Sequence, residues 1–139
     1  MITYAQLREN EEIRTYIKKA DEALAALGYT EHSFAHVTKV SQISSYILTE
    51  MEADSHAVEL AQIAAYLHDI GNLVNRVDHS QSGAVMAFRI LRSMDMDPQD
   101  VATVVSAIGN HDEGTGVPIN DISAALILAD KSDVRRSRV

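Results

Sequence analysis

The chain contains no cysteine, and aromatic residues make up only 5% of its 139 positions. Without cysteine, neither a disulfide framework nor a thiolate metal site can form. Long apolar runs are also missing, because charged residues interrupt every stretch that approaches the roughly 18 residues of a membrane span. The N-terminal segment lacks the basic start and apolar middle of a signal peptide. We therefore expect a soluble, cytoplasmic protein with no membrane partner.

Positive charge is scarce too, since 12 lysines and arginines face 20 acidic residues and the formal net charge is −8. An acidic chain repels a phosphate backbone, and binding to nucleic acid requires clustered basic residues. The one dense basic cluster is KSDVRRSR, close to the C-terminal end. We therefore expect no nucleic-acid partner. A small anionic substrate remains compatible with this charge if a bound metal ion supplies a local positive field.

Helical signals dominate what is present, and no segment shows the period-two alternation of a half-buried strand. The length suits one domain, and a hydrophobic fraction of 46% is enough for a core. The sequence thus predicts an all-α fold, a compact bundle of about six helices with a metal site in its core. We expect one domain over residues 1–139, with an N-terminal helix within 1–30 and a metal-binding core over 31–131.

Capping residues and apolar spacing set the expected helix boundaries. The six predicted helices run from Thr3 to Leu27, from Glu31 to Glu52, from Asp54 or Ser55 to Asp69, from His79 through Leu91, from Asp97-Pro98 to Gly109-Asn110, and from Asp121 to Val134. Thr3 and Gln6 can form a capping box, and Gly28 is a typical residue after a helix end.

Several apolar helix stretches carry or end in side chains that are costly to bury. His36 and His68 continue apolar faces, although a lone histidine there is more often a core residue with a hydrogen-bond partner. Asp69 stands at a helix C-terminus, where the helix dipole disfavours a carboxylate. Asp130 ends the apolar run ISAALILAD, and its simplest interpretation is a buried salt bridge.

His79 and His111 stand at helix boundaries, where either could equally be a surface cap. Taken together, the unusual residues form a set of four imidazoles and two carboxylates: His36, His68, Asp69, His79, His111 and Asp130. Mixed nitrogen and oxygen ligands suit Fe, Mn, Co, Ni or Zn. Six ligands exceed what one open catalytic ion needs, so we expect two ions with Asp69 as the bridge.

The order H…HD…H…H…D over residues 36–130 resembles the HD-domain superfamily of metal-dependent phosphohydrolases. The resemblance implies an HD-domain fold, with a metal-activated hydroxide that cleaves a phosphoester or phosphoanhydride bond of a nucleotide-like substrate. His79 and His111 point to the dinuclear subset. The segment HSQSGA, together with Ala129-Asp130, looks like the bacterial hydrolases of symmetrical dinucleoside tetraphosphates. The HD-GYP cyclic-dinucleotide phosphodiesterases are a more distant match, because Asn72 replaces their lysine.

The same resemblance implies roles for the ligand set and two divalent transition-metal ions, with iron the first choice and Mn, Co, Ni or Zn as alternatives. One ion would be held by His36, His68, Asp69 and Asp130, and the other by Asp69, His79 and His111. Asp69 and His68 are the expected catalytic residues, and Asp69 would also orient the nucleophile. Asp112 could orient His111 through a hydrogen bond.

Four residues are candidate phosphate contacts, and an ordinary solvated face is an equally good interpretation of each. They are Asn72, Arg76, Lys131 and Arg135. His32 could act beside the substrate but is more simply a surface residue, and His56 is interpreted as structural. Alternatives to phosphohydrolysis are an HD-type di-iron oxygenase, a signalling domain that binds a nucleotide without turnover, and a metal-stabilised bundle. A homodimer is an expectation from the family.

Overall fold

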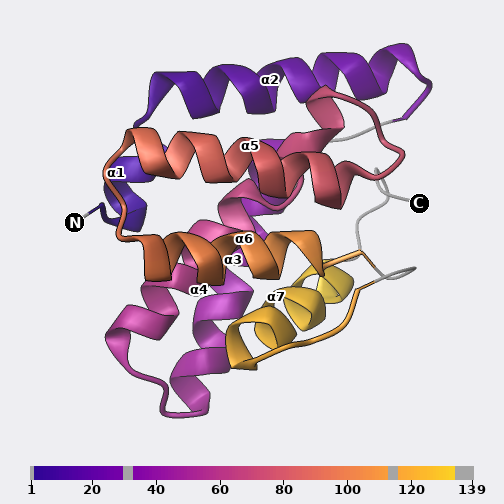
Figure 1. The fold of residues 1–139 in the computed structure, drawn as a ribbon. Helices are drawn as coiled ribbons and strands as arrows, with labels where there is room; N and C mark the ends of the chain where they lie inside the picture. Colours follow the sequence, from indigo (N-terminus) through magenta and orange to yellow (C-terminus); the bar gives the residue numbers. More distant parts are fainter. Residues whose placement is uncertain (1, 30–32, 113–115, 134–139) are drawn as a thin grey trace.

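The computed structural model describes residues 2–29, 33–112 and 116–133. Within these ranges the secondary structure consists of seven α-helices and one short 3₁₀ helix, and no strand is present (Figure 1). The predicted all-α fold is therefore confirmed, with one helix more than the sequence indicated. The described helices form a bundle whose members come from the whole length of the chain.

The predicted single helix at the N-terminus is wrong, because two helices occupy that segment. Helix α1 spans Tyr4–Arg8 and helix α2 spans Glu11–Ala26. Asn10 separates them, since its side-chain oxygen accepts a hydrogen bond from the backbone N–H of Ile13 at 3.0 Å and starts a new helix. The predicted capping box of Thr3 and Gln6 is confirmed at the start of α1.

Two long helices form the centre of the molecule. Helix α3 spans Ser33–Glu50 and helix α4 spans Ser55–Leu67, with Asp54 as the α4 cap. The predicted start of the α3 segment at residues 31–32 lies outside the described residues. Helix α4 is buried along its second half, where every residue from Leu60 to Leu67 except Gln62 is less than 9% exposed. Helix α4 is thus the core of the bundle, and its C-terminal end lies inside the protein.

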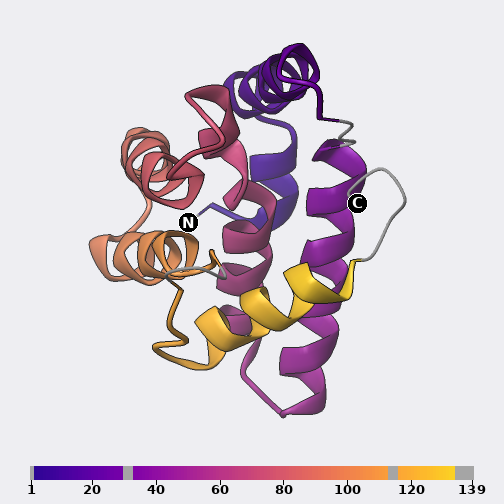
Figure 2. The ribbon, with the colours of Figure 1, turned by 90° about the vertical axis from the view of Figure 1, so that its right-hand side faces the viewer.

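The remaining helices surround this pair. Helices α5, His79–Ser93, and α6, Pro98–Gly109, pack together, while helix α7, Asp121–Ser132, crosses α3 and α4. Figure 2 shows α3 on one side of α4 and the α5–α6 pair on the other. Asn120, rather than the predicted Asp121, caps α7, because its side-chain oxygen accepts the backbone N–H of Ser123 at 2.9 Å.

The predicted third helix extends too far, since α4 ends at Leu67 and a 3₁₀ helix, η1, follows at Ile70–Leu73. This change of direction places the His68-Asp69 pair between two helical segments instead of inside one. In the part of the chain that the structure describes, no helix has both the length and the apolar character needed to cross a membrane.

Candidate metal centre

The six residues proposed as metal ligands come from six separate elements or their ends and meet in one cluster. His36 lies in the first turns of α3, His68 caps the end of α4, and Asp69 precedes η1. The other three stand at helix ends: His79 opens α5, His111 follows α6, and Asp130 lies in the last turn of α7. Helix ends thus bring to one point residues that are far apart in the sequence.

One half of the cluster surrounds the Oδ2 oxygen of Asp69. His36 Nε2 lies 3.2 Å from His68 Nε2 and 3.3 Å from Asp69 Oδ2. Asp130 Oδ1 lies 3.1 Å from His36 Nε2 and 3.4 Å from His68 Nε2. Two imidazoles and two carboxylates therefore present one donor atom each to the same small volume.

The other half surrounds the Oδ1 oxygen of Asp69. His79 Nε2 lies 3.3 Å from this oxygen and His111 Nε2 lies 3.6 Å from it. The two imidazole nitrogens are themselves 3.2 Å apart. Asp69 thus has one oxygen toward each pair of histidines, which is the arrangement that a bridging carboxylate requires.

These separations fit a metal site. Ligand atoms bound to one ion at about 2.0–2.2 Å are roughly 3.0–3.5 Å apart when they are neighbours in its coordination shell. The chemistry of the donors also fits, because imidazole nitrogen and carboxylate oxygen together suit divalent transition metals. His36, His68 and His111 are at most 3% exposed, so a cation at this place would be largely shielded from water.

The second ring nitrogen of each of the four clustered histidines is occupied, which fixes how each ring faces the cluster. The Nδ1–H groups of His68 and His111 donate to the carbonyls of Ala65 and Ile108, each at 2.6 Å. The Nδ1–H of His79 donates to the carbonyl of Arg76 at 3.1 Å. Because carbonyl oxygens only accept, these bonds leave Nε2 as the nitrogen available to a metal ion.

The hydrogen bond of His36 is different in kind. Its Nδ1–H donates to the Asp133 carboxylate, with 2.7 Å between Nδ1 and Oδ2. Asp133 is buried at the end of α7, and sequence reasoning did not single it out. A signal was available, because Asp133 follows Asp130 by three residues and such pairs lie on one side of a helix. For His111, the orienting role that the sequence assigned to Asp112 belongs to the Ile108 carbonyl.

The acidic residues strongly influence the titration of the metal-free cluster. Burial lowers the pKa of His36, but contacts with Asp130 and Asp69 outweigh it and raise that pKa to about 10. Burial likewise opposes ionisation of Asp69 and Asp130, while the neighbouring histidines hold the pKa of both carboxyls below the usual range. Without a metal ion, protons supply the positive charge that the two carboxylates require.

The sequence also matches a protein family. The family model described as HD domain matches residues 33–135, well over half of the chain. The chain belongs to the HD domain family. The six clustered residues all lie within the matched region, so the HD domain includes the whole candidate metal centre.

Two relatives extend this result. A solved structure similar to this HD domain is that of a predicted HD superfamily hydrolase from an uncultured Thermotogales bacterium. The two sequences are 29% identical, and the TM-score of the structures is 0.65. The match covers 94% of this chain and 73% of the hydrolase chain. The uncharacterized protein MJ1020 of Methanocaldococcus jannaschii is 25% identical over 97% of this chain. This chain spans only 60% of the length of MJ1020.

A close approach of two backbones positions His79 in this HD domain. A Cβ atom added to Gly71 would lie 1.9 Å from the carbonyl oxygen of His79 and 2.5 Å from the backbone nitrogen of Gly83. Only glycine therefore allows η1 to pass this close to α5. The glycine of the HDIG segment is therefore required by packing. It allows the start of α5, with His79, to lie against Asp69.

The predicted substrate contacts differ in their access to solvent. Asn72 is only 3% exposed, and its side-chain oxygen accepts a hydrogen bond from Arg76 Nη1 at 3.3 Å. Arg76 is half-buried and Lys131 is exposed. Asn72 thus positions Arg76, which leaves Arg76 and Lys131 as the accessible charges among the described candidates. Arg135 lies outside the described residues.

Two further histidines, at positions 32 and 56, are interpreted from the sequence as lying outside the ligand set. His32 lies outside the described residues. His56 is half-exposed and forms an ion pair with Asp100, with 2.9 Å between Nε2 and Oδ1. This pair lies near the N-terminal ends of α4 and α6, which agrees with the structural interpretation of His56.

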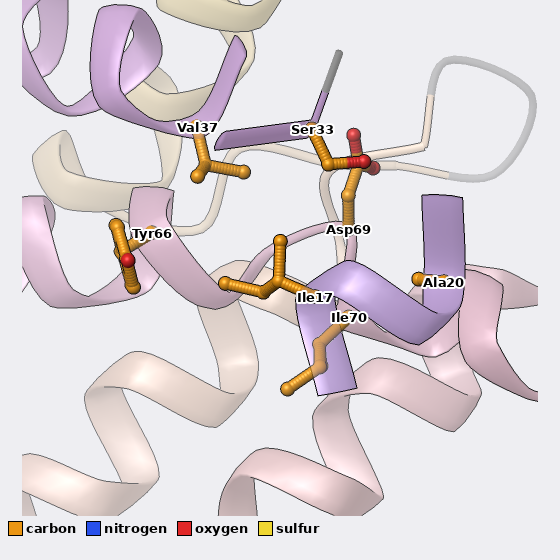
Figure 3. Close-up of a pocket in the computed structure, with 7 residues that line it drawn as sticks. All are labelled: Ile17, Ala20, Ser33, Val37, Tyr66, Asp69 and Ile70. Atoms are coloured by element: carbon orange, nitrogen blue, oxygen red, sulfur yellow. The ribbon is translucent and has the colours of Figure 1, made fainter. Parts of the chain in front are cut away.

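The cluster is closed toward α2. A narrow pocket beside Asp69 has no room for a ligand, and its walls are mostly apolar (Figure 3). Its lining consists of Ile17, Ala20, Ser33, Val37, Tyr66, Asp69 and Ile70. Among the six clustered residues, the Asp130 side chain is the most exposed, at 19%. A substrate would therefore approach from the side of α7.

Proposed function

We propose that this HD domain is a metal-dependent phosphohydrolase that acts on a phosphoester or phosphoanhydride bond of a nucleotide-like substrate with two divalent transition-metal ions. The observation that carries the proposal is the position of Asp69, whose two oxygens each face a separate pair of histidine Nε2 atoms. Membership of the HD domain family and the similarity to a predicted HD superfamily hydrolase support hydrolysis as the general reaction.

Each half of the cluster would hold one ion. His36, His68 and Asp130 would share the first with Asp69 Oδ2, while His79 and His111 would share the second with Asp69 Oδ1. Such ions lower the pKa of bound water and neutralise charge on phosphoryl oxygens. Iron is our first choice, and Mn, Co, Ni and Zn accept the same ligands.

The chain's own residues would hold and orient the reactants. Asp69 would orient the attacking water, and the His68 ring is fixed for its role by the Ala65 carbonyl. Arg76 would contact phosphate oxygens, since Asn72 already orients its guanidinium. Lys131 adds a second positive charge, next to Asp130 in the chain. The apolar walls on the α2 side would limit the access of other water molecules to Asp69.

The test is a product-resolved hydrolysis panel on metal-reconstituted protein. The panel contains dinucleoside polyphosphates, cyclic dinucleotides, nucleoside mono- and triphosphates, and a generic phosphodiester. We expect metal-dependent cleavage of one class, with at least a hundredfold loss in Asp69→Ala because the shared ligand is gone. Asp100→Asn, which alters a histidine–aspartate pair away from the metal centre, should retain activity.

Metal content provides a second measurement on the same proteins. His111→Ala should leave about one ion per chain, since the His36 half keeps all of its ligands, whereas Asp69→Ala weakens both halves. A metal-to-protein ratio that is equal in these two variants would contradict the bridging role. A panel without cleavage, combined with oxygen consumption by the metal-loaded protein, would replace the phosphohydrolase proposal with an oxygenase.

A further inference from the structure

The four histidines of the metal centre obtain their Nδ1 acceptors in two different ways. His68, His79 and His111 each donate to the backbone carbonyl three residues earlier in the chain. His68 and His111 follow the last turns of α4 and α6, and His79 is the first residue of α5. Each of these carbonyls also accepts the backbone N–H of the same histidine, at 3.3–3.5 Å, and its second lone pair accepts the ring Nδ1–H.

Among the described residues, His36 pairs its Nδ1 with a side chain instead of a backbone carbonyl. It lies within α3, where the backbone carbonyls accept N–H groups of the next turn. The acceptor that the structure shows comes from another element, since the Asp133 carboxylate at the end of α7 accepts the Nδ1–H of His36 at 2.7 Å. His36 is 1% exposed and Asp133 is 6% exposed, so water does not replace this acceptor easily.

We infer that Asp133 is the positioning residue of the metal centre, which holds the His36 ring so that Nε2 faces Asp69 and Asp130. The inference rests on the proposed metal centre and adds a residue to it that is not itself a ligand. A carboxylate acceptor also makes an imidazole a stronger donor to a metal ion than a carbonyl does. The ion on the His36 side therefore depends on Asp133, and the ion on the His79 side does not.

Helix α7 thus contributes to the centre twice. Asp130 provides a ligand atom 3.1 Å from His36 Nε2, and Asp133 binds the opposite nitrogen of the same ring at 2.7 Å. The imidazole is held between two carboxylates from one helix. A small displacement of α7 would change both contacts together, whereas the His79 half contains no residue of α7.

The experiment is a Co²⁺ titration of metal-free protein, followed by visible absorption, which resolves the two ions without any substrate. Asp133→Ala removes the acceptor, and Asp133→Asn keeps an acceptor oxygen without the charge. We expect Asp133→Ala to weaken one of the two binding steps by about 10- to 100-fold and to leave the other step unchanged. Asp133→Asn should fall between Asp133→Ala and the wild type.

Asp100→Asn is the matched control, because Asp100 also accepts a hydrogen bond from a histidine but does so outside the metal centre. Its Co²⁺ titration should equal that of the wild type. Circular dichroism of each variant establishes that it is folded, and Asp133→Asn keeps the test valid if Asp133→Ala does not fold.

The possible failures are distinguishable. A wild-type protein that binds no Co²⁺ would overturn the proposed metal centre itself. A wild type that binds two ions, with folded Asp133 variants that bind both equally well, would overturn only the role of Asp133. Equal weakening of both ions would also overturn it, because that result indicates a general structural effect.

Discussion

His36 is the clustered histidine whose two ring nitrogens both face carboxylates. Asp69 and Asp130 lie beside Nε2, and Asp133 lies beside Nδ1. Although burial alone lowers the pKa of this imidazole, the carboxylates raise it to about 10 from an ordinary 6.5. A metal ion requires the neutral ring, so it must displace a proton from His36 at neutral pH.

This shift predicts how the stability of the metal-free protein depends on pH. A histidine with a raised folded pKa contributes stability that is complete below its unfolded pKa and is lost as the pH rises through the folded value. We therefore expect the free energy of unfolding to fall between pH 6.5 and about 10 in protein stripped with a chelator. Urea denaturation at several pH values measures this free energy of unfolding.

Other groups titrate near pH 10, so the comparison must isolate His36. The variant His36→Gln removes the ionisable ring and should show a weaker loss of stability over the same pH range. If stripped wild type and His36→Gln lose stability in parallel, the raised pKa of His36 is not the cause.

At the scale of helices and their connections, Gly71 determines how close η1 comes to α5. Gly71→Ala would force its new methyl group against the His79 carbonyl, only 1.9 Å away. We expect a loss of about 1–3 kcal/mol of stability from overpacking. The shift of α5 should also release the ion on the His79 side. Thermal denaturation and metal content measure the two effects.

Gly109→Ala is the control for this element, because its nearest neighbour is the Ala84 side chain at 3.6 Å, an ordinary contact. It also lies two residues before His111. We expect this variant to keep both ions and nearly all of its stability. A Gly71→Ala protein as stable as Gly109→Ala would mean that η1 and α5 can separate without cost.

The elements were predictable to different degrees, for physical reasons. Apolar spacing and caps located α3 through α7 to within a few residues, because those signals are local. The break at Asn10 was missed, since apolar residues continue on both sides of it and favour one long helix. The seventh helix arises from that break, and its cap is visible only once the hydrogen bond to Ile13 is known.

The same distinction applies to the site. Four of the six candidate ligands stand out singly, as charged or titratable groups in or at the end of an apolar helix stretch. His79 and His111 stand out only when they are taken together with those four. The spacing of Asp133 from Asp130 is a local signal, but its partner His36 is 97 residues away, so the sequence does not indicate which ring Asp133 contacts. The burial of Asn72 also depends on tertiary packing, which turns a predicted substrate contact into a support for Arg76.

At the scale of the whole molecule, the candidate metal centre connects α3, α4, α5, α7 and the segment after α6. An ion that binds only the folded state stabilises it, by about 4 kcal/mol at a thousandfold excess over its dissociation constant. We expect chelation to lower the melting temperature, and Co²⁺ or Fe²⁺ to restore it. Differential scanning calorimetry measures the change.

Calcium serves as the control in that experiment, because it prefers six to eight oxygen ligands and this centre offers mainly imidazole nitrogen. Ca²⁺ should therefore leave the melting temperature of the chelated protein low. Equal recovery with Ca²⁺ and Co²⁺ would contradict a transition-metal centre and indicate a nonspecific effect of charge.

The position of α7 near the end of the described chain has a consequence for folding during synthesis on the ribosome. His36 is synthesised early, but Asp130 and Asp133, which face its two nitrogens, belong to the last described helix. A nascent chain therefore carries an incomplete set of ligands until α7 has left the exit tunnel and packed on α3. The proposed ion on the His36 side would therefore bind late, only after synthesis has passed Asp133 and α7 has packed on α3.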